Sequence, residues 1–280
     1  MENLSITNEF DEISTQELLS CALYLAQRGE KDRCWDYISA LRRRGTADIF
    51  EYASRWCKSK NPTERELGAN ILAQLGFASD HPFKEKSLPI LEQLISDSSE
   101  AVVEATLYAL GNLHAHEVSL KAISLKSHQS AETRFALTQA LLCNEHPDAI
   151  SALIHLSKDA DDEVRDWATF GLGSMIGTCS TEIQDALMER VVDPVPEVRG
   201  EAYVGLARCR DERVIPYLKR ELESGEISVL EVEAALRIRS SELLEALEEI
   251  SKWWETDKEM LADAIYACRT GKFPDGYIDM

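Results

Sequence analysis

The sequence predicts an all-α protein made of about eight stacked helical hairpins. Residues 163–173 read EVRDWATFGLG, and residues 197–207, thirty-four positions later, read EVRGEAYVGLA. Residues 101–111, AVVEATLYALG, repeat the pattern further upstream. Apolar or small residues recur at i, i+3, i+4 and i+7, the helical period, and no strand-like alternation competes with it. Because a single hairpin cannot bury its own apolar face, repeats of this length are expected to stack into one continuous core.

Each repeat is expected to supply two helices, and the second helix begins at a recurring anchor position. The eight anchors are Cys34, Gly68, Val103, Arg134, Arg165, Arg199, Val229 and Lys258. An amphipathic segment before each anchor forms the first helix of the pair. The chain is therefore expected to be one domain over 1–280, with an N-terminal extension 1–13, hairpins over 14–269 and a C-terminal tail 270–280.

Turn and capping residues mark where the helices begin and end. Ser14 with Glu17 predicts a capping box for the first helix. Second helices are introduced by Asn61-Pro62 and by the segments 159–162 and 193–196, whereas Gly45, Gly76 and Gly111 follow helix ends. Trp253 and Trp254 are expected to close the last hairpin, with at least one ring buried.

Composition excludes several classes of protein. The 280 residues are 44% hydrophobic, which is ample for a core, and carry a formal net charge of -20, which repels nucleic acid. No apolar run is long enough for a membrane helix, and the N-terminus lacks the pattern of a secretory signal. The seven cysteines contain no Cys-x-x-Cys, so reduced core thiols are expected. These features predict a cytoplasmic protein that binds neither nucleic acid nor membrane.

The runs VRDWATFGLG and VRGEAYVGLA, with DERVIPYLKREL at 211–222, resemble HEAT repeats of the bacterial type also found in phycobilisome lyases. Pro89 and Pro216 fit the proline that often kinks the first helix of such repeats. The resemblance covers roughly residues 60–240 and implies a right-handed α-solenoid of about eight HEAT-like helical hairpins. In HEAT proteins the second helices line the concave surface.

Helical register then selects the residues that could contact a partner. Offsets +1, +2 and +5 from each anchor point away from the core, because +3, +4 and +7 form the packed stripe. In the last helix these are Glu259, Met260 and Asp263. The partner-binding candidates are Trp35, Asp36, Asn70, Glu104, Tyr108, Phe135, Gln139, Asp166, Trp167, Phe170, Glu201, Val204 and Glu231.

These positions combine aromatic rings with carboxylates and include no lysine or arginine. Rings provide contact area at little entropic cost, and carboxylates orient and attract a positively charged surface. The pattern therefore favours a basic protein partner, bound by a monomer. Arg165 and Arg199 are expected to be structural, each tied to an aspartate such as Asp161, Asp162 or Asp193.

Signatures of catalysis and metal binding are missing from the sequence. His116-Glu117 is a single His-Glu pair, whereas HEAT-type hydroxylases with two irons use several, so no metal and no cofactor are expected. No phosphate-binding loop or nucleophile elbow occurs, although a triad assembled only in space stays open. The chain is expected to have no catalytic residue.

Three functional hypotheses follow. The length, repeat type and acidity resemble those of HEAT-repeat immunity proteins found beside Rhs-type polymorphic toxins, which implies a toxin–antitoxin role in which the chain occludes a basic toxin domain. An adaptor or scaffold protein is the alternative. A HEAT-type enzyme, a lyase or a hydroxylase, is the third.

Overall fold

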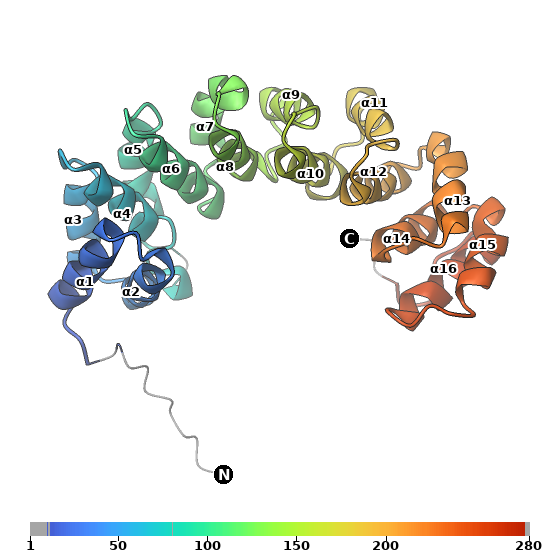
Figure 1. Ribbon diagram of the computed structural model, residues 1–280, viewed down its shortest axis with the longest axis horizontal. Helices are drawn as coiled ribbons and strands as arrows, with labels where there is room; N and C mark the ends of the chain where they lie inside the picture. The colour runs from blue at the N-terminus through green and yellow to red at the C-terminus, as the bar shows by residue number, and fades with distance from the viewer. Residues whose placement is uncertain (1–9, 11, 80, 278–280) are drawn as a thin grey trace, which may run out of the picture. The chain divides into compact units, whose positions relative to one another are not determined.

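The computed structural model describes residues 10, 12–79 and 81–277, and these fold into helices only (Figure 1). By their contacts the residues divide into two compact units, Met1–Leu141 and Leu142–Met280. The expectation of a single domain stays a prediction, as does the handedness of the stack. Most of the predicted N-terminal extension and residues 278–280 of the tail lie outside the described residues.

The first unit holds four helical pairs. Their bounds are α1 (Thr15–Gln27) with α2 (Lys31–Arg44), α3 (Ala47–Trp56) with α4 (Pro62–Leu72), α5 (Lys84–Leu94) with α6 (Glu100–Asn112), and α7 (His116–Ser119), continued by the 3₁₀ turns of η2 (Leu120–Ser127), with α8 (Ala131–Leu141). A short 3₁₀ turn, η1 (Phe77–Ser79), follows α4. In this unit α4 packs on α6 and α6 on α8.

The second unit holds four more pairs. These are α9 (Pro147–Leu156) with α10 (Asp162–Phe170) and its π-helical extension η3 (Gly171–Met175), α11 (Thr181–Arg190) with α12 (Pro196–Arg208), α13 (Ile215–Ser224) with α14 (Val229–Ile238), and α15 (Leu244–Ile250) with α16 (Lys258–Thr270). The 3₁₀ turns η4 (Glu212–Val214) and η5 (Ser241–Leu243) precede α13 and α15. Helices α10, α12, α14 and α16 pack on one another in order.

Local sequence explains these helix boundaries. The Ser14 hydroxyl accepts a hydrogen bond from the N–H of Glu17, which is one of the two bonds of the predicted capping box, and the Asn61 side chain caps α4 beside Pro62. The Asp161 carboxylate accepts two backbone N–H groups at the start of α10. Gly45, with φ of 58°, ends α2 in the left-handed conformation. At these ends, caps satisfy some of the backbone groups that a helix leaves without a partner.

The core follows the predicted apolar stripe of each helix. Val164, Ala168 and Leu172 are fully buried, as are Val198 and Ala202 at the equivalent positions one repeat later. Trp254 is 5% exposed and Trp253 is 50% exposed, which confirms that one ring of this pair is buried. Among the described residues no helix is long and apolar enough to cross a membrane.

The expectation of seven reduced thiols is wrong for two cysteines. Cys179 and Cys209 form a disulfide, while the other five are free. The two residues are 30 apart in the chain, about one repeat, and stacking of successive repeats brings them to a Cα–Cα distance of 5.5 Å. Their sequence spacing resembles no known cysteine motif, so this pairing depends on the tertiary structure.

Candidate functional site

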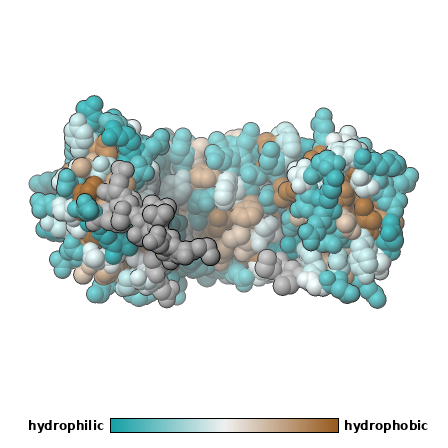
Figure 2. Space-filling view, turned by 90° about the horizontal axis from the view of Figure 1, so that it is seen from below, coloured by the Kyte–Doolittle hydropathy of each residue, from teal (hydrophilic) through white to brown (hydrophobic). Residues whose placement is uncertain are grey.

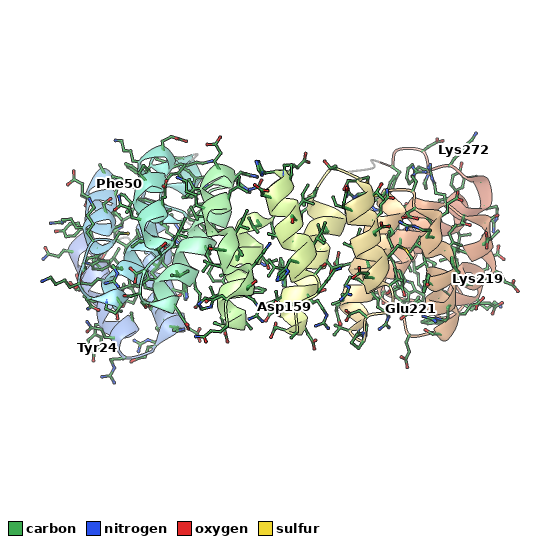
Figure 3. The ribbon with its side chains drawn as sticks, turned by 90° about the horizontal axis from the view of Figure 1, so that it is seen from above. Tyr24, Phe50, Asp159, Lys219, Glu221 and Lys272 are labelled. Carbon is green, nitrogen blue, oxygen red and sulfur yellow. A yellow bond between two sulfur atoms is a disulfide. The ribbon has the colours of Figure 1, made fainter. Side chains whose placement is uncertain are left out.

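Recurring arginines establish the true register of the second helices. In each case a guanidinium nitrogen donates to the backbone carbonyl six residues earlier: Arg65 to Ser59, Arg134 to His128, Arg165 to Asp159 and Arg199 to Asp193. Figure 3 labels Asp159, in the turn before α10. Arg65 is thus the equivalent of Arg165, and the predicted anchor Gly68 lies three residues too late.

A similar correction applies to Val103. Thr138 and Thr169 donate to the carbonyls of Arg134 and Arg165, four residues earlier, and Thr106 does the same to Val102. Val102 is therefore the anchor of α6. The sequence register was displaced because apolar residues at neighbouring positions fit the helical period almost equally well.

The predicted structural role of the arginines is confirmed for Arg165. Its guanidinium donates to both carboxylate oxygens of Asp193, at 3.0 and 3.1 Å, and to Asp162 at 2.8 Å. Arg199 instead pairs with Glu221, labelled in Figure 3, on α13. Arg65 makes a further pair of this kind with Asp97, at 2.7 Å. These ion pairs connect one helical pair to the next within each unit.

Three predicted partner-binding residues are buried, so the expectation that they face outward is wrong. Asn70 is 9% exposed, and its backbone carbonyl accepts from the buried guanidinium of Arg42. Val204 is 3% exposed and packs in the core. Glu231 is 4% exposed because its carboxylate accepts hydrogen bonds from the N–H and the hydroxyl of Ser228, a capping box.

The second unit gathers three carboxylates on its second helices, Asp166 of α10, Glu201 of α12 and Glu233 of α14. We call them the carboxylate row. Burial is the largest cause of the raised pKa of Glu201, about 7, and the negative charges of Asp166 and Glu233 add to it. Burial, followed by neighbouring acids, also raises the pKa of Asp166. Adjacent negative charges with little solvent form a site that a positive group would stabilise.

Existing partners neutralise the carboxylate row only in part. Arg237 pairs with Glu233 at 2.9 Å, and the hydroxyl of Ser174 donates to Glu201 at 3.4 Å. One buried oxygen of Asp166 has no hydrogen-bond partner among the described residues. A buried acceptor of this kind gains free energy when a donor reaches it.

An aromatic pair lies beside the carboxylate row. Trp167 and Phe170 are half-buried on α10, and their rings make an edge-to-face contact with centroids 5.6 Å apart. Both residues occupy predicted positions, and Trp167 directly follows Asp166 in the chain. In Figure 1, α9 and α11 lie on one side of this unit, and α10 and α12 lie on the other. Figure 2 shows the molecule from the side of α10 and α12, where the surface is mainly hydrophilic with some hydrophobic areas.

The first unit carries a smaller set of the same residue types. Glu104 accepts a hydrogen bond from the Thr133 hydroxyl at 3.0 Å, and the rings of Tyr108 and Phe135 lie 6.3 Å apart. The pKa of Glu66 is raised, mainly by burial. The positive charge of Lys31 acts against this shift, and the negative charge of Glu104 adds to it. Lys31 brings a cation to this face, so the first unit is less negative than its predicted residues suggested.

The remaining predicted residues of the first unit lie on α2 and α8. Trp35 and Asp36 are exposed on α2, and the Arg42 guanidinium lies 4.9 Å from the centre of the Trp35 ring. Gln139 is half-buried on α8, and its amide nitrogen has no hydrogen-bond partner among the described residues. The carboxylate row with its aromatic pair is therefore the better defined candidate.

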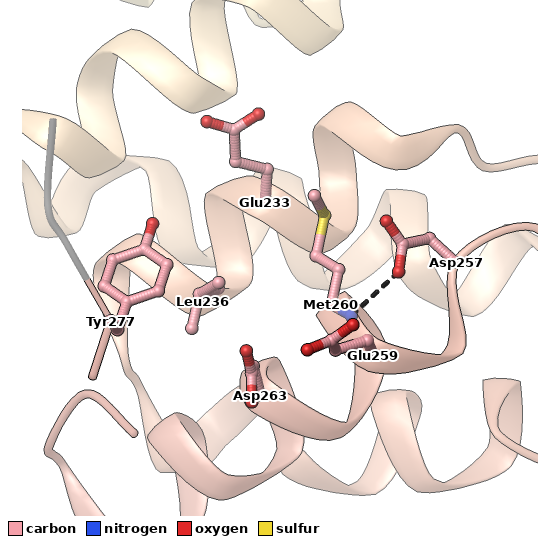
Figure 4. A pocket seen from close by; sticks show the side chains of 7 residues that line it. All are labelled: Glu233, Leu236, Asp257, Glu259, Met260, Asp263 and Tyr277. Carbon is pink, nitrogen blue, oxygen red and sulfur yellow. Dashed lines mark hydrogen bonds between the residues drawn. The ribbon is translucent and has the colours of Figure 1, made fainter. Parts of the chain in front are cut away.

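A cavity of about 330 Å³ continues from the carboxylate row toward the C-terminus (Figure 4). It is lined by Glu233, Leu236, Asp257, Glu259, Met260, Asp263 and Tyr277. Glu259, Met260 and Asp263 are the residues that the register predicted for the last helix. The Asp257 carboxylate accepts from the N–H of Met260 at 2.9 Å, so it caps α16.

The sequence analysis missed two acids of these surfaces, Glu233 and Glu66. Glu233 was missed because the Val229 anchor assigned the outward positions of α14 to Leu230, Glu231 and Ala234. Glu66 was missed because of the Gly68 anchor. The arginine three residues before Gly68, aligned with Arg165, was the available signal for Glu66.

No group of three or more potential metal ligands occurs among the described residues. The rings of His114 and His116 lie 6.2 Å apart, next to Glu117. The expectations of no metal, no cofactor and no catalytic residue stay predictions.

The Glu201→Gln variant is expected to be more stable than wild type at pH 8. Because the pKa of Glu201 rises from 4.5 to about 7 on folding, the native state binds this proton more tightly than the unfolded state. Its contribution to stability is therefore lost as pH rises from about 4.5 through 7. Since Glu201 keeps some contact with water, we expect a gain of about 1–2 kcal/mol. Urea unfolding at pH 5 and pH 8 measures it.

Glutamine does not titrate, so the variant should also lose the part of the pH dependence that Glu201 causes. Glu226→Gln, at an exposed position before α14, is the matched control and should behave as wild type. Identical pH dependence in wild type and Glu201→Gln would contradict the assignment.

Comparison with known proteins agrees with this architecture. Residues 150–237 match the family described as HEAT repeats. Protein YibA of Escherichia coli (strain K12) is 27% identical over 232 residues, 80% of this chain and 81% of YibA. The X-ray structure of E. coli YibA has a TM-score of 0.71 at 24% identity, covering 90% of this chain and 92% of that one. The crystal structure of an engineered protein has a TM-score of 0.62 at 19% identity, covering 92% and 75%.

These similarities confirm the predicted resemblance to HEAT repeats and the all-helical repeat fold. The resemblance to immunity proteins of Rhs-type toxins stays a prediction.

Proposed function

Since the chain carries HEAT repeats, we propose that it is a non-enzymatic protein-binding repeat protein whose second helices hold a basic protein partner. The observation that carries the proposal is the carboxylate row beside the aromatic pair Trp167 and Phe170. Glu201 and Asp166 have neighbours of their own sign, with raised pKa values. An arginine or lysine of the partner would supply the missing positive charge, and the rings would exclude water around the contact.

The overall charge supports a partner of this class. A formal net charge of -20 attracts a basic protein from a distance and speeds association at low ionic strength. The acidic cavity between α14 and α16 extends the same surface beyond Glu233. Aromatic rings are enriched among the central residues of protein interfaces, and carboxylates beside them favour a positively charged partner.

In its most specific form, the proposal is that the chain acts as a monomeric immunity protein in the cytoplasm and occludes a toxin domain of the Rhs type. The resemblance to HEAT-repeat immunity proteins supports this form. Carboxylates would occupy the place of an anionic substrate in a cationic toxin domain. An adaptor that joins two proteins through the same surface is the alternative.

This form of the proposal predicts a gene for a toxin domain next to this one, and that toxin domain provides the test. Coexpression with the wild-type chain should restore growth of cells that produce the toxin domain, and coexpression with an Asp166→Asn/Glu201→Gln variant should not. Loss of both charges should weaken binding at least about tenfold, or 1.4 kcal/mol, chiefly through slower association. Glu226→Gln should protect as well as wild type. A folded double variant that binds and protects fully would overturn the proposal.

A further inference from the structure

The disulfide joins the end of α12 to the segment between η3 and α11. Cys209 follows the last residue of α12, the helix that carries Glu201, and Cys179 lies in the segment 176–180 between η3 and α11. The same segment follows Ser174, whose hydroxyl contacts Glu201. The disulfide therefore ties the segment after η3 to the end of α12.

The two elements approach each other at the level of the backbone. A Cβ atom built on Gly205 would lie 2.5 Å from the Cα of Gly173, so neither position has room for a side chain. The position of η3 relative to α12 thus sets where Ser174 lies beside Glu201. The disulfide at Cys179 lies beyond the end of η3 and adds a covalent tie between the following segment and α12.

Other contacts would keep the segment near α12 without the disulfide. The Arg208 guanidinium donates to the carbonyls of Gly173 at 2.8 Å and Ile176 at 2.5 Å, and the Ile176 side chain is fully buried. The N–H of Gly177 donates to Glu145 at 3.0 Å. Reduction should therefore loosen residues 177–180 and leave the helical pairs intact.

The cysteines differ in their access to solvent. Cys179 is exposed, and Cys209 is half-buried. Burial raises the pKa of the Cys34 thiol to about 11 and the pKa values of Cys57 and Cys268 to about 12. Since the thiolate is the reactive form, these three thiols are protected from exchange. Five free thiols out of seven are also unlike a scaffold built on structural disulfides.

We propose that Cys179 and Cys209 form a reversible redox site, whose disulfide fixes the segment 177–180 against the end of α12. The reductant is a dithiol protein or small dithiol. Its thiolate attacks the exposed sulfur of Cys179, the Cys179–Cys209 bond breaks, and Cys209 leaves as a thiolate that takes a proton. The second thiol of the reductant then displaces Cys179, so two electrons and two protons reach this chain and the reductant becomes a disulfide.

The experiment examines the free protein and needs no partner. The full chain is equilibrated with mixtures of oxidised and reduced dithiothreitol, alkylated under native conditions and mapped by mass spectrometry. We expect Cys179 and Cys209 to become labelled together, with one midpoint, and the Tm to fall by roughly 5–10 °C. Amide exchange should quicken at least about tenfold over 177–180, with helical circular dichroism unchanged.

Cys179→Ser and Cys209→Ser should each have the Tm of the reduced wild type whether oxidant is present or not. Cys143→Ser, the matched control, should retain the redox-dependent Tm shift. Failure of the oxidised protein to form the Cys179–Cys209 bond, or loss of helical structure on reduction, would overturn the proposal.

Discussion

Replacing Trp167 and Phe170 together by alanine is expected to weaken partner binding by at least about 100-fold. Each ring is half-buried beside Asp166, where a partner could cover it completely, and central aromatic residues of interfaces contribute about 2 kcal/mol or more each. Affinity is measured by calorimetry or surface plasmon resonance with the partner captured by the wild-type chain.

Both rings pack partly against α10 and its neighbours, so the double variant should also lose about 1–2 kcal/mol of stability. Binding is therefore compared at a temperature where thermal melts show both proteins folded. Trp253→Ala is the matched control, since this ring is 50% exposed and also contacts another ring, Trp254. If the folded double variant keeps its partner as well as wild type, this face is not the binding surface.

Asp193→Ala is expected to cause a large loss of stability, about 3–5 kcal/mol. The Asp193 side chain is 3% exposed and accepts from Arg165, Arg190 and the N–H of Val195. Its removal leaves the Arg165 guanidinium, 8% exposed, without its main counter-ion. Urea unfolding at pH 7 measures the effect. Asp162→Ala is the matched control: this carboxylate contacts the same arginine but is 70% exposed, so its loss should cost less than about 1 kcal/mol.

Asp193 should also contribute to acid unfolding. Burial alone would raise the pKa of Asp193, but the hydrogen bonds from Arg165 and the Val195 N–H outweigh it and hold the pKa below its usual value. A lowered pKa in the folded state gives stability that is present above about pH 4 and is lost as pH falls below it. The Asp193→Ala variant should therefore lose less stability than wild type between pH 5 and pH 2. Equal losses would contradict this role.

Much of the fold could be predicted because the signals that define each repeat are local in the sequence. The helical period, the caps at Ser14 and Asp161 and the glycine at 45 each act within a few residues, so they can be identified without tertiary information. The same holds for the family resemblance over 163–173 and 197–207. The register of a second helix was wrong where a small residue such as Gly68 resembled an anchor.

By itself the sequence determined an all-helical repeat protein, a strongly negative surface and the positions of Asp166, Trp167, Phe170 and Glu201. Only the tertiary structure decided that Val204 and Glu231 are buried, that Glu233 joins the carboxylate row and that Cys179 meets Cys209. The reason is physical: helical hydrogen bonds and caps are local, whereas burial, charge proximity and disulfide pairing depend on how one repeat packs on the next. A displacement of one residue in register rotates a side chain by about 100° around the helix. That rotation is enough to move a residue from the surface to the core.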